Sequence, residues 1–102
     1  MTIKQSVSIE HYESYADLLK VLVHPVLLCI INGLLHKGAC NVSYMQECLN
    51  MPQSTVSQHI SILKNKGIIK GTRKGLEISY SVVNPIVVEL MNVLTKEADN
   101  HK

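Results

Sequence analysis

The segment from Asn41 to Val82 constrains the fold of this chain more than any other stretch. Turn residues at 50–52 separate two runs with helical spacing, and Gly67 ends the second run. Two runs typical of strands follow, joined by a predicted turn at residues 73–75. In the last run, apolar residues alternate with polar ones, which predicts a strand with one buried face formed by Leu76, Ile78, Tyr80 and Val82.

Helical patterns flank this segment on both sides. Apolar residues recur at helical spacing over 9–23, and Pro25 forces a boundary before a second, more apolar helix that runs to about Leu35. Asn41 or Ser43 is suited to cap the next helix, and Ser43 with Gln46 fits a capping box. A last helix is expected from Asn84-Pro85 to about Ala98.

The order of these elements predicts a mainly α fold with a small β-hairpin, α-α-α-α-β-β-α. This is the outline of a winged helix-turn-helix, an arrangement that places one helix in the major groove of DNA. A chain of 102 residues is expected to form one domain. We assign residues 9–98 to that domain, residues 1–8 to a flexible tail and residues 99–102 to a C-terminal tail.

The apolar runs and the cysteines of the chain indicate its cellular compartment. The apolar runs are interrupted by charges, Pro or His before they reach a membrane-spanning length, and the N-terminus lacks the apolar core of a secretory signal. Three cysteines without a Cys-x-x-Cys pair suit a reducing compartment. We therefore expect a cytoplasmic protein without a membrane partner.

The distribution of charge is more informative than the net charge of +2. Between Cys48 and Leu76 the chain has no acidic residue, whereas six of the eight acids lie in the terminal parts of the chain. The same stretch holds five cations, namely Lys64, Lys66, Lys70, Arg73 and Lys74. A positive centre that coincides with a helix-turn-helix pattern favours a nucleic-acid partner.

The second helix of the motif, predicted over Ser54–Lys66, has the surface of a DNA reader. Val56, Ile60 and Leu63 form its apolar stripe, and the opposite face is polar but uncharged before Lys64. Short hydroxyl and amide side chains can bond base edges and phosphate oxygens. The predicted DNA contacts of this helix are Gln53, Ser54, Thr55, Ser57, Gln58, His59, Ser61 and Lys64, and those of the hairpin and its flank are Lys66, Lys70, Arg73 and Lys74.

Nearly the whole chain resembles the ArsR/SmtB family of bacterial winged-helix repressors. Residues 18–25 look like the entry to that family's second helix, residues 53–60 and 63–69 like its recognition helix and exit, and residues 75–81 like its wing. One departure is Leu27, where the family commonly has Arg. The resemblance implies a homodimer that represses transcription by occupying a double-stranded DNA operator, expected to be pseudo-palindromic.

The sequence predicts dimerisation independently, because the first and last helices are too apolar for one small domain to cover. The predicted interface residues are Tyr12, Tyr15, Leu19, Val87, Leu90, Met91 and Leu94.

The sensory sites known from the family are not matched. Asn41 and Ser43 stand where the arsenic-type motif has cysteines, and Asn32 stands where the persulfide-sensing type has its first cysteine. The zinc-type positions hold Val83, Ile86, Glu97 and Asn100. We therefore predict no metal and no cofactor. One alternative is a thiol- or metal-responsive site at Cys40, expected to be the most exposed cysteine, with His36 or His11; Cys29 is expected in the core.

The sequence disfavours two other functional classes. A winged-helix module that binds protein rather than DNA is disfavoured by the acid-free stretch with its five cations. An enzyme is disfavoured because the sequence lacks a nucleophile–base–acid set at a recognisable spacing and a glycine-rich phosphate loop. We expect a DNA-binding regulator that is not an enzyme.

Overall fold

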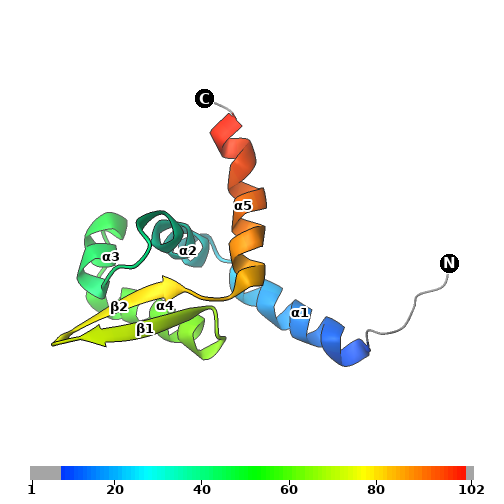
Figure 1. The fold of residues 1–102 in the computed structure, drawn as a ribbon, viewed down its shortest axis with the longest axis horizontal. Helices are drawn as coiled ribbons and strands as arrows, with labels where there is room; N and C mark the ends of the chain where they lie inside the picture. The colour runs from blue at the N-terminus through cyan, green and yellow to red at the C-terminus, as the bar shows by residue number, and fades with distance from the viewer. Residues whose placement is uncertain (1–7, 101–102) are drawn as a thin grey trace.

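The computed structural model describes residues 8–100, so residues 1–7 and 101–102 of the predicted tails at 1–8 and 99–102 lie outside the described residues, whereas residues 99–100 belong to the last helix. Five helices and one hairpin follow in the predicted order (Figure 1). Helix α1 spans Ile9–Leu22 and α2 spans Pro25–Lys37, two residues beyond the predicted end. His24 caps α2 by accepting a bond from the Val26 N–H at 3.2 Å, and Gly38 ends it at a φ of 96°.

Helices α3 (Val42–Leu49) and α4 (Gln53–Asn65) form the helix-turn-helix. Asn41 caps α3 by accepting from the Tyr44 N–H at 2.9 Å, so the predicted capping box that starts at Ser43 is not formed. The turn passes through Asn50, whose φ of 55° is one that asparagine tolerates better than most residues. Pro52 then precedes the first turn of α4.

The antiparallel hairpin consists of β1 (Ile69–Lys74) and β2 (Glu77–Val82). Lys74 pairs with Glu77, so the turn is Gly75-Leu76 and not residues 73–75 as predicted. Leu76 is consequently fully exposed at the tip, and the prediction that it belongs to the buried face was wrong. Further along β2 the predicted alternation is seen only in part, because Tyr80 is buried but Ile78 and Val82 on its face are half-buried like Ser79 and Ser81 on the other face.

The core lies between α2, α3, α4 and the hairpin. The predicted stripe of α4 is confirmed, since Val56 and Leu63 are fully buried and Ile60 nearly so. Buried residues of the other elements that join them are Leu22, Leu27, Ile30, Ile31, Leu34, Cys40, Met45, Ile68, Ile69, Tyr80, Val87 and Met91. Burial of aliphatic side chains is the main stabilising term in a domain with so few aromatic residues.

Helix α5 spans Pro85–Asn100, two residues beyond its predicted end. The Asn84 side chain caps it by accepting from the N–H groups of Ile86 and Val87 at 2.9 and 3.3 Å. Figure 1 shows α1 and α5 projecting away from the unit formed by the other elements. No single helix within residues 8–100 is long and apolar enough to cross a membrane; α1 and α2 pass that test only as a pair bent by 91°.

The burial of the cysteines differs from prediction. Cys40 is buried with 7% of its surface exposed, whereas Cys29 is exposed, so both expectations were wrong. Cys40 loses its surface because its backbone N–H and C=O pair with Tyr80 of β2, at 3.2 and 2.9 Å. Cys29 lies off the stripe by which α2 faces the core, which consists of Leu27, Ile30, Ile31 and Leu34.

Candidate nucleic-acid interface

The outer face of α4 is polar and open to solvent. Six of the eight side chains predicted to contact DNA on this helix are exposed: Gln53, Ser54, Ser57, Gln58, Ser61 and Lys64. Their exposure follows from the helical period, because the stripe of Val56, Ile60 and Leu63 anchors the opposite side. The face therefore presents hydroxyl and amide groups with one cation at its end.

Two of the predicted contacts are placed differently. Thr55 and His59 are half-buried. The His59 ring faces inward and stands edge to face with His24, with the ring centroids 5.3 Å apart. The buried Nδ1 of His59 has no hydrogen-bond partner within the described part of the chain. His59 thus packs against the start of α2 more than it faces a ligand.

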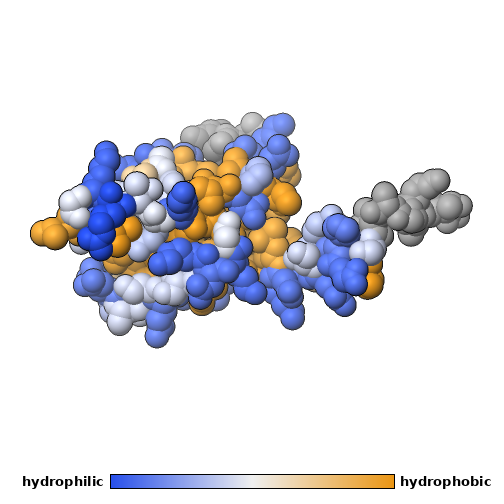
Figure 2. All heavy atoms as spheres, turned by 60° about the horizontal axis from the view of Figure 1, so that its bottom comes forward, coloured by the Kyte–Doolittle hydropathy of each residue, from blue (hydrophilic) through white to orange (hydrophobic). Residues whose placement is uncertain are grey.

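The cations lie beside this face. Lys64 on α4 and Lys70 and Arg73 on β1 line one shallow groove of about 320 Å³ between the helix and the hairpin. Lys66 and Lys74 are also exposed. Figure 2 shows hydrophilic residues along the edge of the molecule that α4 and the hairpin form. Anionic phosphates of a DNA backbone could lie along such a cationic groove.

The hairpin tip is set by local bonds. Gly75 has a φ of 64°, a conformation that glycine adopts without a steric cost, and its carbonyl accepts from the Arg73 guanidinium at 3.3 Å. Leu76 was predicted to belong to the strand and lies in the turn, whereas Arg73 and Lys74 were predicted to belong to the turn and lie in β1. A glycine followed by one residue, between two strands, is a known two-residue hairpin signal and could have identified this turn.

Strand β2 is tied to the helix-turn-helix along its first half, next to the hairpin turn. The Asn41 side chain donates to the Glu77 carboxylate at the start of β2 while it caps α3. The Cys40–Tyr80 backbone bridge lies next to it. The sequence predicts the capping role of Asn41, whereas its contact with Glu77 joins residues 36 positions apart and no local pattern reveals it.

The residues predicted to form the dimer interface differ in their exposure. Tyr12, Tyr15 and Leu19 on α1 are 44–50% exposed, and Leu94 on α5 is 58% exposed. Leu90 is half-buried. By contrast, Val87 and Met91 are buried within the protomer, and they therefore belong to its own core rather than to a surface that another chain could cover.

The described residues contain no group of three or more His, Cys, Asp or Glu side chains arranged to hold a metal ion. Within that part of the chain, Cys40 is not joined to His36 or His11 in such a group, so the alternative of a metal site at Cys40 gains no support.

Comparison with known proteins gives one consistent result. Residues 29–70 match the sequence profile described as "Bacterial regulatory protein, arsR family". The transcriptional repressor PagR of Bacillus anthracis is 44% identical over 82 residues, which cover 80% of this chain and 82% of that protein. The transcriptional repressor SmtB of Mycobacterium tuberculosis is 35% identical over 75 residues, covering 74% of this chain and 55% of that protein.

Solved structures agree in fold. The crystal structure of PagR superimposes with a TM-score of 0.79 at 41% identity, covering 85% of this chain and 99% of that one. A winged helix-turn-helix DNA-binding domain from Mycobacterium bovis, described as homodimeric, gives a TM-score of 0.78 at 24% identity over 99% of this chain and 93% of that one. The latter likeness supports the fold alone.

Proposed function

Because this chain belongs to the ArsR family of bacterial regulatory proteins, we propose that it binds its operator as a homodimer and reads it with the exposed face of α4. It is a DNA-binding transcriptional repressor of that family. The observation that carries the proposed reading mode is the polar face of α4 running into a cationic groove, without an acidic residue between Cys48 and Leu76.

We assign two roles to the side chains of this surface. Gln58 is exposed at the middle of α4 and can bond adenine through two hydrogen bonds, which gives sequence preference. Ser54, Ser57 and Ser61 lie on the same side and can donate to base edges or phosphates. The cations of the helix end and hairpin bind phosphates, which fixes the position of the protein without reading the sequence.

The dimer is supported by the apolar surface left on the two projecting helices. Helix α1 and its C-cap expose Ile9, Tyr12, Tyr15, Leu19 and Val23, and α5 with the residues before it exposes Val83, Ile86, Val93 and Leu94. So much exposed apolar area on two helices marks an interaction site more often than a free surface. A two-fold pairing of these helices would bury it and would set two α4 helices against two half-sites of a pseudo-palindrome.

The proposal is tested by selecting bound fragments from bacterial genomic DNA and titrating the recovered fragment at several salt concentrations. We expect recovered sites to contain two related half-sites about one helical turn apart. The logarithm of the affinity should fall with the logarithm of the salt concentration with a slope of several units, because each phosphate contact releases counterions. Recovery of no fragment above background, or of sites without a repeated half-site, would contradict the proposed mode.

A further inference from the structure

A second site shares no lining residue with the cationic groove. The space between α2 and α3 is a cavity of about 340 Å³, within the size range of small-molecule sites. All three cysteines of the chain line it. Its other lining residues are mainly apolar, and they are Ile30, Gly33, Leu34, His36, Lys37, Tyr44, Met45 and Leu49.

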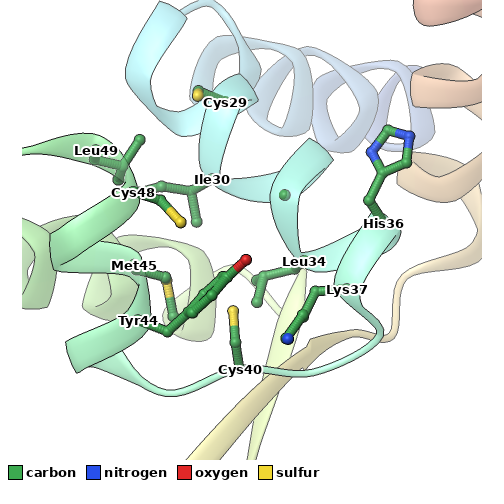
Figure 3. A pocket seen from close by; sticks show the side chains of 11 residues that line it. Cys29, Ile30, Leu34, His36, Lys37, Cys40, Tyr44, Met45, Cys48 and Leu49 are labelled. Carbon is green, nitrogen blue, oxygen red and sulfur yellow. The ribbon is translucent and has the colours of Figure 1, made fainter.

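Two kinds of side chain line this cavity, namely thiols that can react and aliphatic groups that can hold an apolar ligand. In Figure 3 the sulfurs of Cys40 and Cys48 point into the space from two sides of the Tyr44 ring, whereas His36 points away from it. Ile30, Leu34 and Leu49 supply an aliphatic wall. The Lys37 ammonium stands at the edge, with its Nζ 4.7 Å from the centre of the Tyr44 ring.

The thiols are not equivalent. Burial raises the pKa of the Cys40 thiol, with the nearby Cys48 adding to this effect and Lys37 opposing it, so Cys40 stays protonated and unreactive at neutral pH. Cys48 is exposed on α3, so a reagent can reach its sulfur from the cavity. The pKa of Tyr44 is also raised, first by its hydrogen bond with Cys48, so its hydroxyl stays a donor. Cys48 is therefore the available nucleophile.

We propose that this cavity is an effector site for a small apolar α,β-unsaturated carbonyl compound, which Cys48 captures covalently. An aliphatic wall suits the carbon skeleton, a soft sulfur suits a soft electrophilic carbon, and the Lys37 ammonium can hold the carbonyl oxygen. An apolar cavity with a few convergent polar groups is the usual form of a small-molecule site.

The chemical step is a conjugate addition. The Cys48 thiolate attacks the β-carbon, a carbon–sulfur bond forms, and the π electrons of the C=C bond move onto the carbonyl to give an enolate beside Lys37. The α-carbon then takes a proton from water, which replaces the proton that the thiol released. The thiol has added across the double bond, and no oxidant, reductant or leaving group takes part.

The position of the cavity connects it to both DNA-contacting elements. Its α3 wall includes Tyr44, Met45 and Cys48, and α3 is the first helix of the helix-turn-helix, followed directly by α4. Its floor includes Cys40, whose backbone is bonded to Tyr80 of the hairpin. An adduct wedged between α2 and α3 would displace α4 and the wing relative to each other. This consequence for DNA rests on the proposed function, whereas formation of the adduct does not.

The site is tested without DNA by treating the full chain with benzylideneacetone and mapping the modified cysteines by mass spectrometry. We expect Cys48 to react at least about tenfold faster in the folded chain than in the chain unfolded by urea, because only the folded cavity holds the reagent against it. Iodoacetamide serves as the control, since it alkylates accessible thiols without needing the cavity, and should modify Cys48 within about threefold in the two states. Equal reaction of Cys48 with benzylideneacetone in the folded and unfolded chains would overturn the site.

Gly33→Leu is the variant designed to fill the cavity while leaving Cys48 in place. Gly33 lines the cavity, its φ is not in the left-handed region, and a Cβ added there meets no atom within 4 Å, so a leucine can extend from this position into the space. We expect benzylideneacetone to modify Cys48 about tenfold more slowly in this variant, with iodoacetamide unaffected. Lys37→Met should slow the same reaction, which gives a second test if Gly33→Leu does not fold. Unchanged rates in the folded variants would overturn the site.

The effector role is then measured by fluorescence anisotropy on a selected DNA fragment. The adduct should lower the affinity about tenfold, within the usual range of allosteric coupling, and Cys48→Ser should retain full affinity after the same treatment. An adduct that forms without changing the affinity would overturn the effector role. Failure of the untreated protein to bind any DNA would count against the proposed function alone, because the labelling result stands by itself.

Discussion

Replacing Gly71 by alanine forces a methyl group against the wing's buried aromatic ring. A Cβ at this position would lie 2.9 Å from Cε1 of Tyr80 and 3.0 Å from Cγ2 of Ile78. Carbon atoms normally stand about 3.5–4.0 Å apart, so at least about half an ångström of movement is needed. Tyr80 is only 9% exposed and its backbone is bonded in both directions to Cys40, so the ring cannot withdraw freely.

The expected cost follows from two opposing effects. Overpacking in a core costs about 1–3 kcal/mol. Alanine restricts the unfolded chain more than glycine does, and this effect alone would raise the free energy of unfolding by about 0.4–1 kcal/mol. The clash is the larger effect, and we expect a net loss of about 1–2 kcal/mol in the free energy of unfolding. In a domain of this size each kcal/mol corresponds to about 4–8 °C in Tm.

Thermal and urea unfolding at one protein concentration measure this change. Gly33→Ala is the matched control, because it lies inside a helix and its new methyl group meets no atom within 4 Å. We expect that control to be stabilised by about 0.4–1 kcal/mol. If Gly71→Ala were as stable as the wild type or more stable, the packing of Tyr80 over β1 would not be as described.

Three further changes test other parts of the account. Asn84→Ala removes the cap of α5 and should cost about 0.5–2 kcal/mol in urea unfolding; an unchanged midpoint would mean that the cap is dispensable. Leu94→Glu places a charge in the proposed interface and should give a monomer in sedimentation at micromolar concentration, whereas exposed Lys96→Glu on the same helix should not. Burial raises the pKa of the Cys40 thiol above its ordinary 9.0, so the folded state holds this proton more tightly and stability falls as the pH rises through the folded pKa. Unfolding free energies measured between about pH 8 and pH 10 should therefore decline less steeply for Cys40→Ala, and equal slopes would refute this cause.

Local patterns in the sequence were sufficient to predict the helices and the exposed side of α4. The stripe of Val56, Ile60 and Leu63 fixes which side of α4 is buried, and the exposed side follows from the same period. The hairpin turn was misplaced by one residue because the apolar alternation was extended through Leu76. The pairing of Lys74 with Glu77 leaves Gly75 and Leu76 as the turn. A glycine at the first position of a two-residue turn is itself a hairpin signal.

Features that depend on distant contacts could not be predicted in the same way. Cys40 is buried because it bonds to Tyr80, forty positions further along the chain. Val87 and Met91 share an apolar helix with Leu94, and only the packed structure shows that the first two face the protomer's own core. The cavity with three thiols likewise arises where α2 meets α3, although its cysteines are spread over twenty residues of sequence.

The central claim is that α4 reads the operator while the hairpin holds the phosphates. It is tested most directly by comparing Gln58→Ala with Lys74→Ala on a selected operator and on random DNA of equal length. We expect Gln58→Ala to lose about 1–3 kcal/mol on the operator and little on random DNA, and Lys74→Ala to weaken both about equally. Equal losses on the two DNAs for Gln58→Ala would contradict base reading by α4.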